Sequence, residues 1–254
     1  MPLDIEEVRA RLPGRQIVWL DATPSTMVEA ARLAAAGWPS GTAVGAEEQT
    51  AGQGRYGRSW YSERDSGLYV SVVLRLPLPA AHLPVLTLAL GLATAEAIAR
   101  STGLGCDLRW PNDVLLDGRK CAGILVQAAE AAFIAGIGIN VNHAFFPAEL
   151  TAHAISLRMA SGQSHSRERL LADLLPAVDS FARMLVEGGR APVLRMFARA
   201  SSYACGKRVI VEQGGVMLCG TTQGLDPAGF LTLRQDDGST SVILAGGVRP
   251  AADG

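Results

Sequence analysis

The sequence has few of the features that mark several classes of protein. Its four cysteines form no CxxC pair and follow no regular spacing, which favours free thiols in a reducing compartment over a zinc site or a disulfide framework; they are Cys106, Cys121, Cys205 and Cys219. The formal net charge is −1 over 254 residues. The chain therefore lacks the broad basic field that holds nucleic acid, and we expect no DNA partner.

Catalytic histidines and membrane segments are equally scarce. The four histidines fall in expected loops or at element edges, and we expect none to be catalytic; they are His82, His143, His153 and His165. The apolar run 85–98 is interrupted by Thr87, Gly91, Thr94 and Glu96, which makes it too short and too polar to span a bilayer. Residues 1–14 carry acidic side chains and no long apolar block, so no secretory signal is expected. These absences favour a cytoplasmic protein.

Hydrophobic periodicity predicts an α+β region followed by a β-rich one. Helices are expected at 5–12, 25–36, 86–99, 167–185 and 192–200, and strands at 17–20, 42–46, 68–76, 108–110, 114–116, 122–127 and 133–141. From about Gly206, short alternating strands at 208–212, 216–220, 230–233 and 241–244 are separated by glycine and aspartate turns. This spacing is typical of a small β-barrel. We therefore expect two domains, at 1–202 and 203–254.

A glycine-rich loop carries the first chemical motif. The run from Gly52 to Gly57, GQGRYG, matches GxGxxG literally. A dinucleotide-binding loop would open a helix and have an acidic residue about 20 positions later, whereas a predicted strand at 68–76 follows here. The glycines expose N–H groups, and Arg55 and Arg58 add charge, so the loop suits a phosphate-bearing ligand. A surface turn without function remains the alternative.

Five blocks, in this order along the chain, together resemble the signatures of biotin–protein ligases. They are Ser25-Thr26, the loop QTAGQGRYGRSW from Gln49 to Trp60, RWPND at 109–113, RKCAGIL at 119–125 and GIGINVN at 136–142. The resemblance implies a class II aminoacyl-tRNA-synthetase-like catalytic domain, with a mixed sheet flanked by helices, and a C-terminal SH3-like β-barrel. It also implies a ligase that uses ATP to form biotinyl-5′-AMP and then biotinylates a carrier lysine.

The resemblance assigns one group of residues to biotin. Ser25, Thr26 and Gln49 would bind the ureido ring, whose N–H groups and carbonyl match hydroxyl and amide partners. Gly136 and Gly138 would lie flat against biotin, where side chains would fill the slot. Further residues are expected around biotin or its adenylate, namely Met27, Gly52, Gln53, Gly54, Tyr56, Trp60, Gly123 and Asn140.

The resemblance implies three catalytic residues. Lys120 would contact the biotin carboxylate and then the α-phosphate, and Arg55 would restrain the reactive adenylate. Asp113, together with Asn112, would support the nucleotide side through Lys120, the ribose or a metal. Mg²⁺ is expected to arrive with ATP, and no residue is assigned as a metal ligand.

Three positions depart from the family pattern. Gln53 stands where the family usually has arginine, and Arg109 where it usually has lysine. Some members stack adenine on a tryptophan in the segment around Ala154, and this chain has none there. Trp110 could frame the nucleotide pocket or be a core or dimer-interface residue.

Other functions fit parts of the pattern. A lipoate ligase or an octanoyl transferase would share the fold, but the glycine-loop signature is the hallmark of the biotin branch. A biotin-sensing repressor would need a DNA-reading domain, and only about 20 residues precede Ser25. A catalytically inactive biotin-binding module would not need Lys120 and Arg55. We therefore expect a monofunctional ligase whose partner is a biotin carboxyl carrier protein, and which forms a homodimer through sheet edges.

Overall fold

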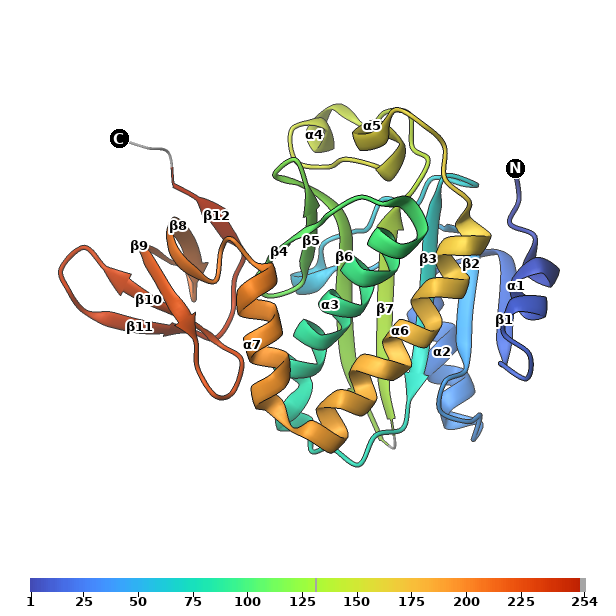
Figure 1. Cartoon of the computed structure of the whole chain (residues 1–254), viewed down its shortest axis with the longest axis horizontal. Coiled ribbons are helices and arrows are strands. Elements are labelled where there is room, and N and C mark those ends of the chain that lie inside the picture. The colour runs from blue at the N-terminus through green and yellow to red at the C-terminus, as the bar shows by residue number, and fades with distance from the viewer. Residues whose placement is uncertain (131, 252–254) are drawn as a thin grey trace.

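The computed structural model describes residues 1–130 and 132–251. Within them lie one large mixed sheet covered by helices and a smaller C-terminal sheet set to one side of it (Figure 1). The glycine loop, the RWPND turn and the edge of the C-terminal sheet lie where these two parts meet.

The large sheet has, in the described chain, seven strands in the order β1-β2-β3-β7-β6-β5-β4. Their bounds are β1 Ile17–Thr23, β2 Ala43–Gln49, β3 Gly67–Leu74, β4 Asp107–Arg109, β5 Asp113–Leu116, β6 Arg119–Ala129 and β7 Ala132–Asn140. Strands β1 and β2 pair in parallel, and the other neighbours are antiparallel. The mixed sheet expected from the sequence is confirmed.

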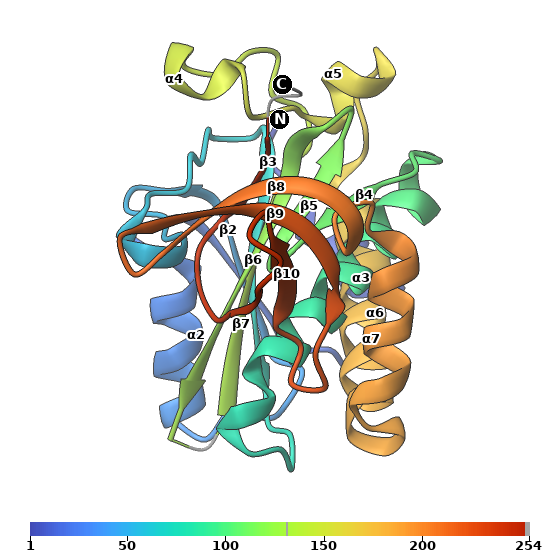
Figure 2. The same ribbon diagram turned by 90° about the vertical axis from the view of Figure 1, so that its left-hand side faces the viewer.

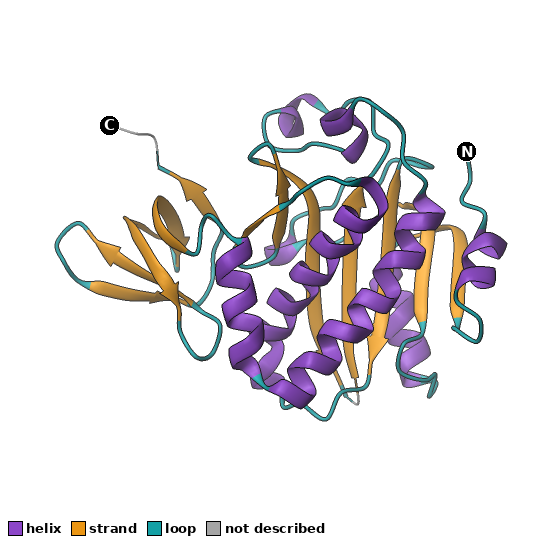
Figure 3. Ribbon diagram, viewed as in Figure 1, coloured by secondary structure: helices purple, strands orange, loops and turns teal. Residues whose placement is uncertain are grey.

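Helices cover both faces of the large sheet (Figure 3). Helices α3 (Leu83–Thr102) and α6 (Arg167–Gly188) lie side by side across one face, and α2 (Thr26–Ala35) lies on the other (Figure 1). The sheet interior is therefore buried on two sides, which explains why β3 is buried at every position and reads as a continuous apolar run. The remaining helices are α1 Ile5–Arg11, η1 Arg55–Gly57, η2 Ala80–His82, α4 Ala148–Thr151, α5 Leu157–Ser161 and α7 Arg190–Ala200.

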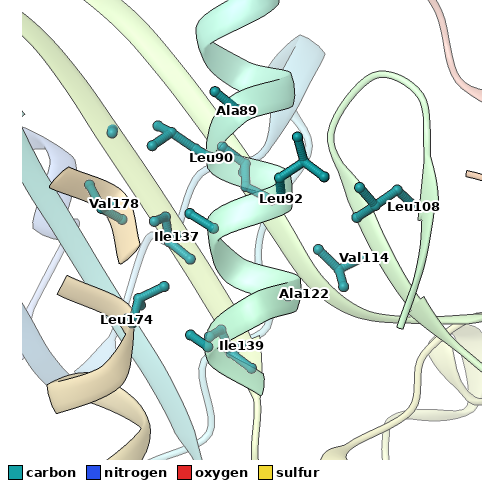
Figure 4. Packing of buried hydrophobic residues seen from close by; sticks show 14 of the residues in the cluster. Ala89, Leu90, Leu92, Leu108, Val114, Ala122, Ile137, Ile139, Leu174 and Val178 are labelled. Atoms are coloured by element: carbon teal, nitrogen blue, oxygen red, sulfur yellow. The ribbon is translucent and has the colours of Figure 1, made fainter. Parts of the chain in front are cut away.

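The main core lies between α3, α6 and the sheet. Figure 4 shows Leu90 of α3, Ile137 of β7 and Leu174 of α6 pointing toward one another. The segment Ala80–Thr102 is long and apolar enough, by length and composition alone, to cross a membrane. The expectation that this run is too short and too polar to span a bilayer is therefore not borne out, but 67% of its most apolar stretch is buried against the rest of the protein, as in the core helix of a globular protein.

The C-terminal sheet has, within the described residues, five antiparallel strands in the order β11-β10-β9-β8-β12. They are β8 Cys205–Gln213, β9 Val216–Leu225, β10 Leu231–Gln235, β11 Thr240–Ile243 and β12 Val248–Pro250. Figure 2 shows how strongly β8 and β9 curve. No pairing between the edge strands β11 and β12 closes the sheet in this part of the structure, so the closed barrel stays a prediction.

Trp110 joins the two sheets. Its ring is 2% exposed, and its Nε1 donates a hydrogen bond of 3.0 Å to the carbonyl of Gly229, in the turn before β10. Between α7 and β8, Ser202 donates from both its backbone N and its hydroxyl to the carboxylate of Asp107. These contacts support a core position for Trp110 between the two sheets, and because Trp110 also lines the larger of two cavities described below, the pocket-framing role stays open.

A buried ion pair fixes the start of the chain to the sheet. Glu47 of β2 and Arg167 of α6 are both 3% exposed, and their side chains are 2.7 Å apart. Glu47 also accepts hydrogen bonds from the backbone N of Leu3 (2.7 Å) and from the indole of Trp19 (2.8 Å), while Arg167 donates to the carbonyl of Met1. Burial raises the pKa of Glu47, but these donors and the guanidinium more than offset that effect and hold the pKa below its usual value.

Candidate active site

Two adjoining cavities are lined by residues of β3, β5, β6 and β7. The first has a volume of about 50 Å³ and the second about 460 Å³. Both are lined by a shared group of residues, Gly54, Arg55, Trp60, Asn112 and Lys120. The shared group means that a ligand in the first cavity would lie next to whatever occupies the second.

Most of the residues singled out in the sequence line these cavities. The first is lined by the shared group and by Ser25, Thr26, Met27, Gln49, Gln53, Gly123, Gly136 and Gly138. Tyr56 and Asp113 line the second. Motifs far apart in the sequence are thus brought into one place.

Two expected site residues line neither cavity. The carbonyl of Gly52 accepts a hydrogen bond from the backbone N of Trp60 at 2.9 Å, which closes the glycine loop. Asn140 is 4% exposed, and its amide donates to the carbonyls of Lys120 and Ile155. Both residues thus hold backbone groups of the site in place. Because neither lines a cavity, their predicted contact with ligand stays a prediction.

Ser25, Thr26 and Gln49 make up the polar end of the first cavity. The Oε1 atom of Gln49 accepts from the backbone N of Thr26 (2.8 Å) and from its hydroxyl (3.0 Å). Ser25 stands at the N-cap of α2, yet its side chain makes no capping hydrogen bond. Its hydroxyl is buried and has no partner in the described structure. Since a buried unpaired hydroxyl is unfavourable, Ser25 is suited to bind a polar ligand in this cavity.

Three strand glycines make room for side chains of the cavity itself. A Cβ atom on Gly138 would lie 2.5 Å from Cε2 of Trp60, and one on Gly136 would lie 2.8 Å from Sδ of Met27. At Gly123 it would meet Lys120 Cε at 2.8 Å. The sequence predicted that Gly136 and Gly138 face the ligand directly; in the structure Met27 and Trp60 lie against them. The indole N–H of Trp60 is buried without a partner and is a second donor available to a ligand.

Lys120 is held by a carboxylate. Its Nζ lies 2.6 Å from Oδ1 of Asp113, whose Oδ2 lies 2.8 Å from the guanidinium of Arg109. Burial raises the pKa of Asp113, but the charges of Lys120 and Arg109 outweigh burial and hold its pKa below the usual value. Asp113 is therefore an ionised positioning group at neutral pH, and Arg109, despite replacing the usual lysine, takes part in holding it.

The glycine loop is tied to the C-terminal sheet. The hydroxyl of Tyr56 accepts hydrogen bonds of 2.8 Å from the guanidinium of Arg55 and from the backbone N of Gly246. Arg55 also reaches Oδ1 of Asn112 at 3.5 Å. Tyr56 adopts a left-handed backbone conformation, with φ of 58°, which is uncommon for a residue with a side chain. The loop thus forms a three-residue 3₁₀ turn and opens no helix, as its sequence predicted.

Other candidates lie away from the reacting groups. Cys121 is fully buried behind Lys120 and contacts the carbonyl of Val114, as expected of a core residue. His143 is fully buried outside both cavities, and burial lowers its pKa to about 4. Ala154 lies alongside Lys120, since the backbone of Lys120 bonds to both His153 and Ile155. A tryptophan at position 154 would therefore stand beside Lys120.

Sequence reasoning missed the wall that the C-terminal sheet contributes. The second cavity is also lined by Ile210, Glu212, Gln213, Gly214, Met217, Ala245, Gly246, Gly247 and Arg249. Two signals were available. The run Gly246-Gly247-Val248-Arg249 agrees with the family's C-terminal region, though less specifically than the five blocks, and the alternation in the predicted strand 208–212 places positions 210 and 212 on one face.

Comparisons with known proteins agree with this geometry. Residues 19–143 match the Biotin/lipoate A/B protein ligase family, and residues 204–248 match the Biotin protein ligase C terminal domain. A biotin–[acetyl-CoA-carboxylase] ligase of Mycobacterium tuberculosis is 34% identical over 97% of this chain and 94% of its own length. The bifunctional ligase/repressor BirA of Bacillus subtilis is 32% identical over 94% of this chain and 75% of its length.

The fold is also similar to solved structures. The biotin protein ligase of Aquifex aeolicus in complex with biotin and ATP superposes with a TM-score of 0.82 at 29% identity, covering 93% of this chain and all of that one. The Leishmania major enzyme in complex with biotinyl-5-AMP gives a TM-score of 0.65 at 26% identity, over 91% of this chain and 99% of that one.

Proposed function

The chain belongs to the biotin/lipoate A/B protein ligase family, and we propose that it is an ATP-dependent biotin–protein ligase. The observation that carries this proposal is the junction of the two cavities. A small cavity with unpaired polar groups, suited to the ureido ring and apolar body of biotin, meets a larger cationic one at Lys120 and Arg55. The relatives named as biotin–[acetyl-CoA-carboxylase] ligases support the same substrate and a carboxyl carrier protein as partner.

In the first step the biotin carboxylate attacks the α-phosphorus of ATP. A bond forms between the carboxylate oxygen and the α-phosphorus, and pyrophosphate leaves with the electron pair of the broken P–O bond. Lys120, positioned by Asp113, supplies positive charge beside the reacting phosphate. An ammonium about 4 Å from a phosphate charge contributes on the order of 4 kcal/mol at an effective dielectric near 20. Because the lysine is already held in place, little reorganisation accompanies the reaction.

In the second step the neutral amine of a carrier lysine attacks the acyl carbon of biotinyl-5′-AMP. The new C–N bond forms as the bond to the phosphate oxygen breaks, AMP leaves with that electron pair, and the nitrogen gives up a proton to solvent. Arg55 stands at the boundary of the two cavities, hydrogen-bonded to Asn112 and Tyr56. From there it is placed to retain the adenylate until the carrier arrives.

Mg²⁺ belongs to the proposal as the counter-ion of ATP and pyrophosphate. Among the residues that the structure describes, no group of three or more histidine, cysteine or acidic side chains is arranged to hold a metal. Asp113 is occupied by Lys120 and Arg109. The phosphates themselves would therefore carry the ion, and its charge would add to that of Lys120 and Arg55.

The domain organisation and assembly are proposed with the function. We divide the chain into a catalytic domain, 1–202, and an SH3-like C-terminal domain, 203–254; the separate sheets and the match at 204–248 support this division. A homodimer is supported by a free edge. From Leu125 to Ala129, β6 is paired only with β7 in the described structure. A cytoplasmic location is proposed as well, in line with the sequence.

The purified chain with ATP, Mg²⁺ and biotin should add one biotin mass to a biotin carboxyl carrier domain. The measurement is intact-mass spectrometry with biotin and lipoate in competition. The carrier with its acceptor lysine replaced by arginine is the control and should stay unlabelled. Labelling with lipoate and none with biotin would transfer the assignment to the lipoate branch of the family.

Replacing Arg55 with glycine should release the adenylate before transfer. The variant loses the contacts to Asn112 and Tyr56 and the charge beside the phosphate, so we expect at least about tenfold more free biotinyl-5′-AMP, the factor that a loss of 1.4 kcal/mol gives. The reaction mixture is separated by chromatography, and bystander lysines on an added inert protein are examined for biotin. Arg183→Gly, on α6 away from both cavities, is the control. Unchanged retention and selectivity in Arg55→Gly would remove this role.

A further inference from the structure

The strand part of the wall that the C-terminal sheet contributes to the second cavity is formed by residues of β8, β9 and β12. Val209 and Val211 of β8 are fully buried in the C-terminal core, whereas Ile210 and Glu212, on the opposite face, line the cavity. Strand pairing sets Met217 directly across from Glu212 and Arg249 directly across from Ile210. The wall is thus an apolar surface with one acidic and one basic side chain.

The charges around this cavity are unevenly matched. Four cations line it, namely Arg55, Arg58, Lys120 and Arg249. The carboxylates that line it are those of Asp113 and Glu212. Asp113 is taken up by two ion pairs, but Glu212 forms no ion pair and no side-chain hydrogen bond within the described chain. Glu212 is therefore an unpaired negative charge in a cavity that otherwise suits phosphates.

An unpaired carboxylate in the wall of the second cavity favours a positively charged ligand group over a negatively charged one. It repels the phosphates of ATP and attracts a cation. Beside it are Ile210 and the 62%-exposed side chain of Met217. Apolar groups next to a carboxylate match a lysine side chain, which has a hydrocarbon stem and a charged end. Four cations line the cavity that a lysine would enter, so a negative charge in its wall lowers the repulsion of the ammonium.

We propose that Glu212, with Ile210 and Met217, receives the acceptor lysine of the carrier protein and guides it toward the adenylate. This inference rests on the proposed function. Glu212 acts on the approach of the lysine and takes no part in forming or breaking bonds; the ammonium loses its proton to solvent before the attack. The C-terminal sheet thereby contributes a specificity-determining residue to the second step of the reaction.

The test separates the two steps in the full-length protein. Adenylate formation is followed by pyrophosphate release without carrier, and transfer by labelling of a biotin carboxyl carrier domain. For Glu212→Gln we expect kcat/KM for the carrier to fall about 5-fold more than the rate of adenylate formation at low salt, which is the size of an exposed ion pair of about 1 kcal/mol. The difference should shrink at high salt, because screening weakens exposed charge pairs, and Glu212→Asp should recover part of it.

Glu187→Gln provides the matched control, because Glu187 is an exposed acid of α6 that lines neither cavity. Equal carrier kinetics in Glu212→Gln and wild type would overturn the inference. So would a salt-independent loss, or a loss of adenylate formation as large as the loss of transfer, since either would place Glu212 in folding or on the nucleotide side. If the wild-type protein labels no carrier, the proposed function itself fails, and that result is distinct from the others.

Discussion

Lys120→Ala should slow formation of biotinyl-5′-AMP by about 10²–10³-fold, the effect of removing roughly 3–4 kcal/mol of transition-state stabilisation. The variant also leaves the ionised Asp113 facing the phosphate with Arg109 as its one remaining cation. Biotin binding should be largely retained, because the residues proposed to bind its ureido ring are Ser25, Thr26 and Gln49. Pyrophosphate release measures the first quantity, and calorimetry with biotin measures the second.

The sequence offers a matched control for this experiment. It contains two lysines, Lys120 and Lys207. Lys207 lies on β8 with its ammonium 5.8 Å from the ring centre of Tyr203, and it lines neither cavity. Lys207→Ala should therefore form adenylate at the wild-type rate. Wild-type turnover by Lys120→Ala, or an equal loss in both variants, would contradict the role given to Lys120.

Arg167→Ala should lower the free energy of unfolding by about 3–5 kcal/mol, because it leaves the buried carboxylate of Glu47 without its cation. It also removes the donor to the carbonyl of Met1. Urea denaturation followed by circular dichroism measures the change. Arg208→Ala is the control; its partner is the exposed Asp236, so the loss of stability there should be far smaller.

The same pair gives a pH dependence of defined sign. The pKa of Glu47 is lower in the folded protein than its usual value, so its ionised form contributes stability above the usual carboxyl pKa. That contribution is lost as the pH falls through the lowered pKa. In Arg167→Ala the contribution should be absent, and acid should destabilise the variant less steeply than the wild type. Parallel acid dependence in the two proteins, or a loss below 1 kcal/mol at neutral pH, would refute this account of the pair.

Periodic segments were predicted well because their pattern is local. Helix α6 shows an apolar stripe with Ser166 as its cap and runs from Arg167 to Gly188 without a break at Pro176. Strand β12 was not predicted, because three residues carry no usable period and the strand is defined by its pairing with β8. Strand β2 was predicted to end at residue 46 but continues to Gln49. Its polar second half gave no strand signal, because Glu47 is buried through contacts with residues distant in the sequence, such as Arg167.

The candidate site was predicted from sequence motifs, and the prediction missed the parts of the site that no motif marks. Ser25, Gln49 and Lys120 meet because β2, β6 and α2 converge on one region, which five separate blocks had indicated. The sequence could not reveal that Trp60 and Met27 occupy the space beside Gly138 and Gly136, since that depends on packing across strands. The wall from β8 was also out of reach, because it follows from how the two sheets are docked.

The bond from Gly246 to Tyr56 sets an order of assembly during synthesis. Tyr56 belongs to a loop made early in translation, whereas Gly246 is added 190 positions later, after all strands of the large sheet. A nascent chain that has completed its large sheet still lacks the backbone N of Gly246. The Tyr56 hydroxyl, which accepts a hydrogen bond from Arg55, therefore has no donor from the C-terminal sheet at that stage. The support that the C-terminal sheet gives to the loop is therefore completed last, and a chain released before Gly246 would lack the donor to the Tyr56 hydroxyl.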